Sequence, residues 1–197
     1  MRSVSIRLPV CAALLSVAAC GVTLERPPHP ALHDFGPTSG DQNQTRARWS
    51  AVSVDAPEWL QDQRIQYRLL YADPTQVRFY AFDRWLAPPP ELLAQRLSIV
   101  GGGGRYRLQI QFQRLEQVFD RPENAYVVMA FRANVWEPDA DRPVGERVFR
   151  LRQATRIPNA AGAVDAFARV IDRAITMLSD WSAELALRRL RRYDGRS

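Results

Sequence analysis

The sequence predicts an α+β fold of two layers, in which a mostly antiparallel sheet carries two helices on one face. Successive stretches between residues 49 and 155 alternate apolar and polar residues with the period of two that strands require. From residue 160 to about 190 the apolar spacing changes to three and four, which is typical of an amphipathic helix. Each predicted helix has one apolar side and each strand one apolar face, so the two layers are expected to cover each other.

The chain opens with a predicted export signal. Arg2 and Arg7 precede an apolar run, LPVCAALLSVAA, that is shorter than the roughly 20 residues a membrane-spanning helix needs. The run ends in VAA and Cys20 follows it, and the resulting VAAC resembles the bacterial lipobox. We therefore expect residues 1–19 to be a lipoprotein signal peptide, with cleavage between Ala19 and Cys20 and a lipid attached to Cys20. The alternative is a plain secreted protein with a cysteine at its new N-terminus.

The residue after Cys20 bears on the compartment. Gly21 stands where many Gram-negative bacteria place an aspartate to retain a lipoprotein in the inner membrane. By resemblance to that sorting rule, we expect a lipid-anchored protein of the outer membrane that faces the periplasm. Cys11 lies in the discarded segment, so a lipidated chain keeps no free thiol and forms no disulfide.

Composition limits the choice of partners. The 197 residues carry a formal net charge of +6, and every basic residue other than histidine is arginine. Such a skew usually reflects genome composition, and export argues against a nucleic-acid partner. A basic surface still favours anionic lipid headgroups or an acidic protein.

Residues 20–48 are predicted to be a lipidated N-terminus followed by a proline-rich tether. Within it, ALHDF at residues 31–35 is a candidate edge strand. The only histidines, His29 and His33, fall in this segment. Their four-residue spacing suits a metal ion only on a helix, and Pro30 between them argues against a helix. We expect both histidines to be solvated tether residues.

The folded domain is predicted over residues 49–187, and its strands are expected in chain order. WSAVSV alternates from Trp49, and RIQYRLLY with QVRFYAF forms a hairpin around a turn at residues 72–75. Pro88 to Pro90 open a helix that ends at Gly101.

The next strand, RYRLQIQF, places Leu108, Ile110 and Phe112 inward, and its alternation slips near Gln113, which predicts a β-bulge. AYVVMAFRANVW is the most apolar strand and is expected at the centre of the sheet. VGERVFRLRQAT follows, with Phe149 and Leu151 inward. The long helix that begins near Ala160 completes the domain. Its predicted core stripe consists of Val164, Phe167, Ile171, Ala174, Leu178, Trp181 and Leu185.

No residue pattern points to catalysis, a cofactor or a metal. The predicted body holds neither a histidine nor a free cysteine, so a Ser-His or Cys-His nucleophile pair has no base there. Residues 101–104, all glycine, follow a helix and precede a strand, the reverse of a phosphate-binding loop. Asp139 and Asp141 lack the further oxygen ligands of a calcium loop. We expect a protein that is not an enzyme.

Two basic features leave alternatives open. The outward strand positions are rich in arginine and glutamine, which is consistent with a binding surface or with a face that is merely solvated. Residues 188–197 form a basic tail, RRLRR and beyond, that either touches lipid headgroups or only complements the dipole of the last helix.

Three stretches resemble the ABC-type transport auxiliary lipoproteins, the family that includes the PqiC-like lipoproteins of MCE transport systems. They are VDAPEWLQDQRIQYR (54–68), FDRWLAPPPELLAQRL (82–97) and ERVFRLRQAT (146–155), followed by the alanine-rich helix that ends in WSAEL. The resemblance covers residues 31 to 187 in the same order of elements. It departs from the family in a weak first strand and in the basic tail.

The resemblance implies an accessory protein of a transporter that moves lipids or other hydrophobic molecules between the two membranes. In this reading the chain is a non-catalytic docking component for a periplasmic MCE-domain protein, held to the membrane by its lipid and acting as a homo-oligomer. The alternative is a periplasmic lipid-binding carrier. A deep apolar pocket would favour the carrier, and a filled core with an exposed patch would favour docking.

Overall fold

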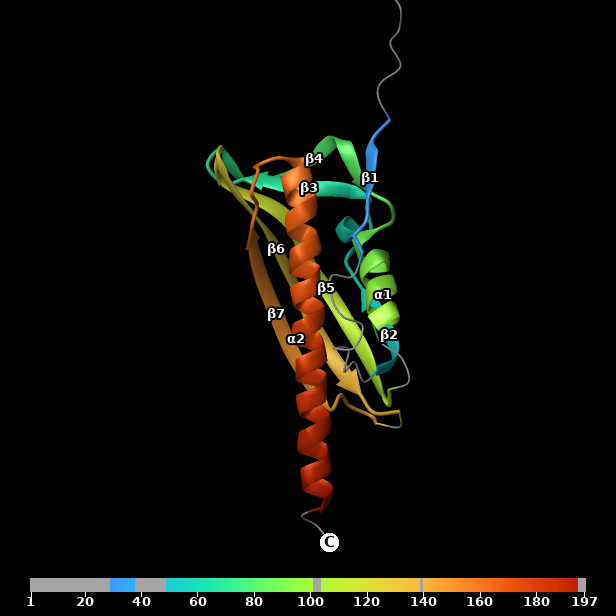
Figure 1. Ribbon diagram of the computed structural model, residues 1–197. Helices are drawn as coiled ribbons and strands as arrows, with labels where there is room; N and C mark the ends of the chain where they lie inside the picture. The colour runs from blue at the N-terminus through green and yellow to red at the C-terminus, as the bar shows by residue number, and fades with distance from the viewer. Residues whose placement is uncertain (1–28, 38–48, 101–103, 139, 195–197) are drawn as a thin grey trace, which may run out of the picture.

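A computed structural model of the chain describes residues 29–37, 49–100, 104–138 and 140–194. In this part of the chain, seven strands form one mixed, mostly antiparallel sheet and two α-helices pack on one of its faces (Figure 1). The predicted α+β fold class is confirmed. The elements are β1 (Ala31–His33), β2 (Trp49–Asp55), the short 3-10 helix η2 (Glu58–Leu60), β3 (Arg64–Leu69), β4 (Asp73–Trp85), α1 (Pro89–Val100), β5 (Tyr106–Arg121), β6 (Asn124–Trp136), β7 (Gly145–Ala154) and α2 (Ala160–Asp194).

The sheet is organised around β5 rather than around the more apolar β6. The strand order is β1-β4-β3-β5-β6-β7, and β2 pairs with β5 outside this path. One side of β5 pairs with β6 in an antiparallel ladder, and its other side pairs in parallel with β2 and then with β3. The prediction that β6 lies at the centre is therefore wrong. Parallel pairings between distant strands decide the order, and these leave no trace in local hydrophobicity.

The predicted bulge in β5 is confirmed between Phe112 and Arg114. It separates the half of β5 that pairs with β2 from the half that pairs with β3. The extra residue, Gln113, exchanges the parity of the strand, so even positions face inward before the bulge and odd positions after it. Leu108, Ile110 and Phe112 are buried inward as predicted.

The β3–β4 hairpin is confirmed, but its turn lies earlier than predicted. Leu69 pairs with Asp73, so the reversal occupies residues 70–72 and Asp73 already belongs to β4. Asp73 makes its local bonds inside the strand, where its carboxyl group accepts from the backbone N–H groups of Thr75 and Gln76. The Asp-Pro-Thr signal therefore marks a local Asx turn beside the reversal rather than the reversal itself.

One apolar core lies between the sheet and the helices. A row of three phenylalanines crosses β5, β6 and β7, because Phe112 pairs with Phe131 and Phe131 with Phe149. The rings of Phe131 and Phe149 stack at 4.9 Å, and Trp181 of α2 closes on Phe149 edge to face. All of these side chains are buried, so the helices cover the inward face of the sheet.

The long helix follows its sequence signals. The side chain of Asn159 accepts the backbone N–H of Gly162, which satisfies one free donor at the start of α2. Of the predicted stripe, Phe167, Ile171, Ala174, Leu178 and Trp181 are buried, whereas Val164 and Leu185 are partly exposed. At the end of α2 the helix extends past the sheet (Figure 1).

The shorter helix α1 lies beside β2, where the indole of Trp49 donates to the carbonyl oxygen of Leu97.

No helix in the described ranges is both long enough and apolar enough to cross a membrane.

Residues 29–37 belong to the folded body and not to a tether. Ala31 to His33 pair in parallel with residues 83–85 of β4, and Phe35 is buried against Trp85 with ring centroids 5.2 Å apart. Gly36 has a φ of 73°, a conformation that favours glycine, and it turns the chain so that its carbonyl accepts from Arg96. The predicted edge strand at residues 31–35 is confirmed over Ala31–His33, and the folded body includes residues that were expected to belong to the tether. Residues 1–28 and 38–48 lie outside the described residues.

Candidate functional site

The face of the sheet that carries no helix is lined with arginines. We call it the arginine face and define it by Arg68, Arg107, Arg114, Arg132, Arg150 and Arg152. Cross-strand partners share a face, and Arg114 and Arg150 both pair with Ala130 of β6. Arg132 likewise pairs with Val148, and Arg152 with Val128. These positions alternate with the buried residues of β6 and β7, so they lie opposite the helices.

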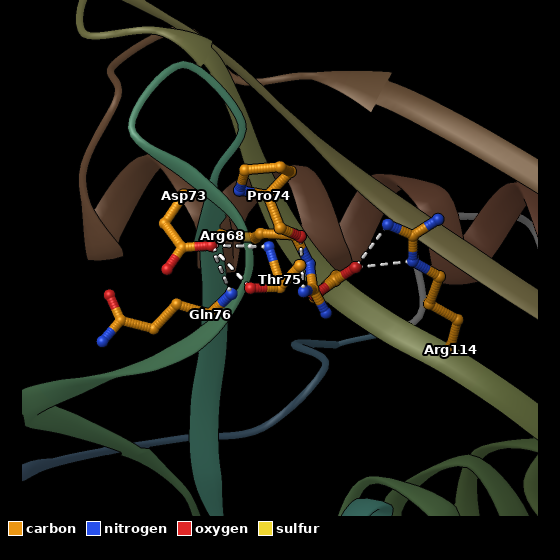
Figure 2. A network of polar contacts seen from close by, with 7 residues as sticks. Arg68, Asp73, Pro74, Thr75, Gln76 and Arg114 are labelled. Carbon is orange, nitrogen blue, oxygen red and sulfur yellow. Dashed lines mark hydrogen bonds and ion pairs between the residues drawn. The ribbon is translucent and has the colours of Figure 1, made fainter.

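The centre of the arginine face is a buried carboxyl group. The Glu116 side chain is 4% exposed, and its two oxygens accept from different arginines. Arg114 approaches one oxygen with its Nε at 2.6 Å, and Arg68 approaches the other at 3.3 Å. Figure 2 shows Arg68 and Arg114 converging from β3 and β5. Because the carboxyl group is buried between two cations, removing it would leave both arginines without their charged partner, and removing the arginines would leave a buried carboxylate unpaired.

Arg68 also connects this centre to the hairpin. Its Nη1 donates to the carbonyl oxygen of Pro74 at 2.9 Å, next to the local turn made by Asp73 and Thr75 (Figure 2). Hydrogen bonds from the hydroxyl and the backbone N–H of Thr75 lower the pKa of Asp73. Arg68 thus links the β3–β4 hairpin to Glu116 of β5.

A shallow cleft lies at the opposite end of the face, where β2, β5 and β6 meet. It is open to solvent and has a volume of about 380 Å³. Arg107 and Trp136 line it, and these two residues are cross-strand partners. Asn134, which lies two residues before Trp136 on β6, is buried, and its Oδ1 accepts no hydrogen bond from the described residues. The cleft therefore offers an arginine and an indole, the residue types that dominate binding hot spots.

The arginine face has an excess of positive charge. Glu116 is engaged by two arginines and Glu146 by Arg132, and Asp55 accepts a hydrogen bond from Gln109. Arg107 and Arg150 form no ion pair within the described residues, and Arg152 approaches Asp120 only at 3.9 Å. The guanidinium carbon of Arg152 lies 3.2 Å from the ring centroid of Tyr126. The surface can therefore attract anionic groups without displacing an existing strong pair.

A second cleft lies between β1 and α2 and has a volume of about 320 Å³. Its apolar lining includes Leu32, Leu86 and Val164, and its polar lining includes His33 and Asp165. Hydrogen bonds from Arg169 lower the pKa of Asp165. Both clefts are open and lie near the lower end of the roughly 300 to 1,000 Å³ that ligand pockets occupy, so neither encloses a large apolar molecule.

The predicted site residues are not brought together. Ala19 and Cys20 lie outside the described residues, as do Gly101 to Gly103 and Asp139. His29 is exposed, in agreement with its prediction.

The prediction for His33 is wrong. Its Nε2 lies 2.8 Å from Oδ1 of Asp83, and it is partly buried. Pro30 excludes a helix at this point but is compatible with the extended β1, and the pairing of β1 with β4 places His33 beside that carboxyl group. Within the described residues, no cluster of three or more potential metal ligands occurs.

Sequence reasoning identified the polar face but not its organisation. The predicted outward residues Arg107, Gln109 and Gln111 lie there. Glu116 was missed because, in the alternating pattern after the bulge, it looks like any other outward residue. The signal that could have identified it is the pair of arginines at Arg114 and Arg68, which flank a carboxyl group once β3 is placed beside β5.

Comparison with known proteins yields fold likeness alone. No protein-family model matches the chain, and no curated protein matches its sequence. Among solved structures, a Xanthomonas campestris protein described as DUF330 superposes with a TM-score of 0.65 at 16% identity, over 83% of this chain and 98% of its own. An uncharacterized protein gives a TM-score of 0.60 at 12% identity, over 78% of this chain and 98% of its own.

A lipoprotein candidate from Caulobacter crescentus gives a TM-score of only 0.33 at 14% identity, over 50% of this chain and 80% of its own. This third likeness is too low to carry an argument. The chain therefore has the fold of a DUF330 protein.

Proposed function

We propose that this chain is a lipid-anchored protein of the outer membrane that docks a periplasmic MCE-domain protein of an ABC-type lipid transport system. Three lines support the proposal. The VAAC motif that ends at Cys20 resembles a lipobox, the sequence resembles the auxiliary lipoproteins of such systems, and the fold matches that of a DUF330 protein. The role requires binding and no catalysis.

The observation that carries the proposal is the unequal use of the two sheet faces. The helix-covered face is filled by side chains such as Phe131, Phe149 and Phe167, each of them 2% exposed or less. The apolar face of the sheet is thereby covered by the helices. The arginine face remains open over the same strands. A body built in this way presents a surface to a partner and leaves little apolar lining for a cargo molecule.

Membrane attachment strengthens weak docking. Several copies anchored in one membrane would share a high effective concentration around one bridging protein, so each contact can be weak. We therefore propose that the chain acts as a homo-oligomer when it docks.

The alternative, a periplasmic lipid carrier, draws on the cleft between β1 and α2. Leu32 and Leu86 are 60% and 56% exposed there and would contact part of an acyl chain.

The test is copurification from the native membrane with the lipid-anchored full chain as bait. We expect an MCE-domain protein to be recovered with the wild-type chain and to be lost with Arg107→Glu and Arg150→Glu combined. A matched control, Arg84→Glu, reverses an exposed arginine on β4 and should retain the partner. Recovery of no MCE-domain protein with any of these chains would contradict the proposal.

A further inference from the structure

A long open edge of the sheet belongs to β7. This ten-residue strand pairs with β6 on one side, and no strand of the described part of the chain pairs with its other side. A second open stretch lies at residues 73–82 of β4, because β1 pairs only with residues 83–85, and the other edges are short or covered. β1 has only three residues, and β2 lies against α1. An open strand edge presents unpaired N–H and C=O groups, which are a template for another strand.

The hydrogen bonds at the end of β7 show which residues face the open side. The N–H group of Thr155 donates to Ala125 on the β6 side at 3.0 Å. The carbonyl of Arg152 instead accepts from Nη2 of Arg173 at 2.7 Å. Backbone groups alternate between the two sides of a strand, so Arg152, Arg150 and Val148 direct their N–H and C=O groups away from β6.

The same alternation places two arginines along this edge, of which Arg152 has one long contact with Asp120 at 3.9 Å. Arg150 and Arg152 are exposed and project from the arginine face, two residues apart. Glu146, which projects from the same face, is held by Arg132, whereas Arg147 projects from the other face beside Phe149. A strand added to this edge would meet guanidinium groups at alternate positions.

We propose that β7 binds an extended segment of a partner protein by strand addition, and that this segment carries acidic side chains at alternate positions. Backbone hydrogen bonds to the even-numbered residues of β7 give affinity, and carboxylates opposite Arg150 and Arg152 give specificity. The proposal rests on the docking function and names the chemistry of the partner for the same face.

Charge also argues against a second copy of the chain as the occupant. If two β7 strands paired around a two-fold axis near Arg150, arginine would face arginine. Like charges directly opposite each other destabilise a strand pair. Arg173 already occupies the carbonyl of Arg152, so the backbone groups left for an added strand are those of Val148 and Arg150 and the N–H group of Arg152.

The test uses synthetic peptides as long as β7 and the full chain in a neutral detergent. The first peptide alternates glutamate and valine. The second replaces each glutamate by lysine. The third keeps glutamate but carries N-methyl groups on alternate backbone nitrogens, so it has the same charge and cannot complete a ladder. Binding is followed by fluorescence anisotropy. We expect binding of the first peptide only, and we expect it to weaken as salt is added.

Two substitutions locate the site. Arg150→Glu should weaken binding of the acidic peptide about tenfold, because one attraction becomes a repulsion. Arg84→Glu on β4, near the other edge of the sheet, should not weaken it. Val148→Pro removes an outward N–H group without removing a bond of the β6 ladder, so it should abolish binding, and Val148→Thr should retain it.

Several outcomes would overturn the inference. These are equal binding of the N-methylated peptide, equal loss in Arg84→Glu, and a concentration-dependent dimer that Val148→Pro abolishes. If Val148→Pro fails to fold, the N-methylated peptide still decides. The two proposals can fail separately. If the acidic peptide does not bind but an MCE-domain protein is still recovered, only strand addition at β7 is rejected. If the peptide binds but no MCE-domain protein is recovered, only the assignment of the MCE partner is rejected.

Discussion

Arg96 of α1 and Asp172 of α2 form an ion pair whose nitrogen and oxygen lie 2.6 Å apart. The same guanidinium donates to the carbonyl oxygens of Phe35 and Pro37, at 3.4 and 3.0 Å, and to that of Gly36. The Arg96 side chain is 7% exposed. One buried cation thus fastens both helices to the segment that leads toward the N-terminus.

Replacement of Arg96 should loosen this junction. Arg96→Met leaves three backbone carbonyls and a carboxyl group without their donor, and we expect a loss of about 3 kcal/mol in the free energy of unfolding. Asp172→Asn keeps the donor and should cost about 1 kcal/mol. Equilibrium unfolding in urea measures both. Equal effects of the two substitutions would contradict the assignment of Arg96 as the fastener of residues 35–37.

The carboxyl group of Glu116 is expected to hold the arginine face in shape. Glu116→Gln leaves Arg68, whose side chain is 20% exposed, without a charged partner, and should cost about 2 kcal/mol. Arg114→Gln removes a cation that is 48% exposed and should cost less than about 1 kcal/mol. Urea unfolding compares them, and hydrogen exchange should show faster opening of the β3–β4 hairpin in Glu116→Gln. A larger loss in Arg114→Gln would reverse this ranking.

The hydroxyl group of Tyr80 should make stability sensitive to alkaline pH. It donates to buried Gln117, and burial raises the pKa of Tyr80 above its ordinary value near 10. The unfolded chain therefore loses this proton before the folded chain does. The stability that Tyr80 contributes is fully present below about pH 10 and falls as the pH rises above it.

The variant Tyr80→Phe isolates this effect. It should be less stable at about pH 8 by about 1 kcal/mol, because Gln117 loses a hydrogen bond, but it should lose less stability on going to about pH 11. Unfolding in urea at the two pH values gives the comparison. Parallel losses in the two proteins would mean that other tyrosines account for the alkaline response.

Lipid attachment at Cys20 remains a prediction. Cys20→Ala should abolish incorporation of labelled palmitate and release the protein from the membrane fraction, because the acyl chains provide the anchor. Cys11 supplies the matched control, since Cys11→Ala lies in the predicted signal peptide and should leave labelling intact. Unchanged labelling in Cys20→Ala would remove the assignment.

Local patterns sufficed for most elements of the fold. Alternation predicted the inward residues of β5, β6 and β7, and the slip at Gln113 predicted the bulge. The change of period predicted α2 and most of its buried stripe. These features are governed by which side of one element faces water, and that information is present in a short window of sequence.

Features that join distant segments could not be predicted in this way. The central position of β5 depends on parallel pairing with β2 and β3, which are separated from it by 50 residues or so in sequence. Arg96 meets Asp172 across 76 positions. A candidate edge strand was predicted at residues 31–35, but the proline and polar residues around it gave no sign that His33 and Phe35 contact β4.

Native mass spectrometry of the full chain from mild detergent distinguishes a docking protein from a lipid carrier. If the protein docks a partner and carries no cargo, the body should retain no stoichiometric phospholipid beyond its covalent lipid and should form a complex with the MCE-domain protein. The filled core and the two small clefts are the reason for this expectation. One non-covalent phospholipid retained per chain, with no complex formed, would contradict the account and identify a carrier.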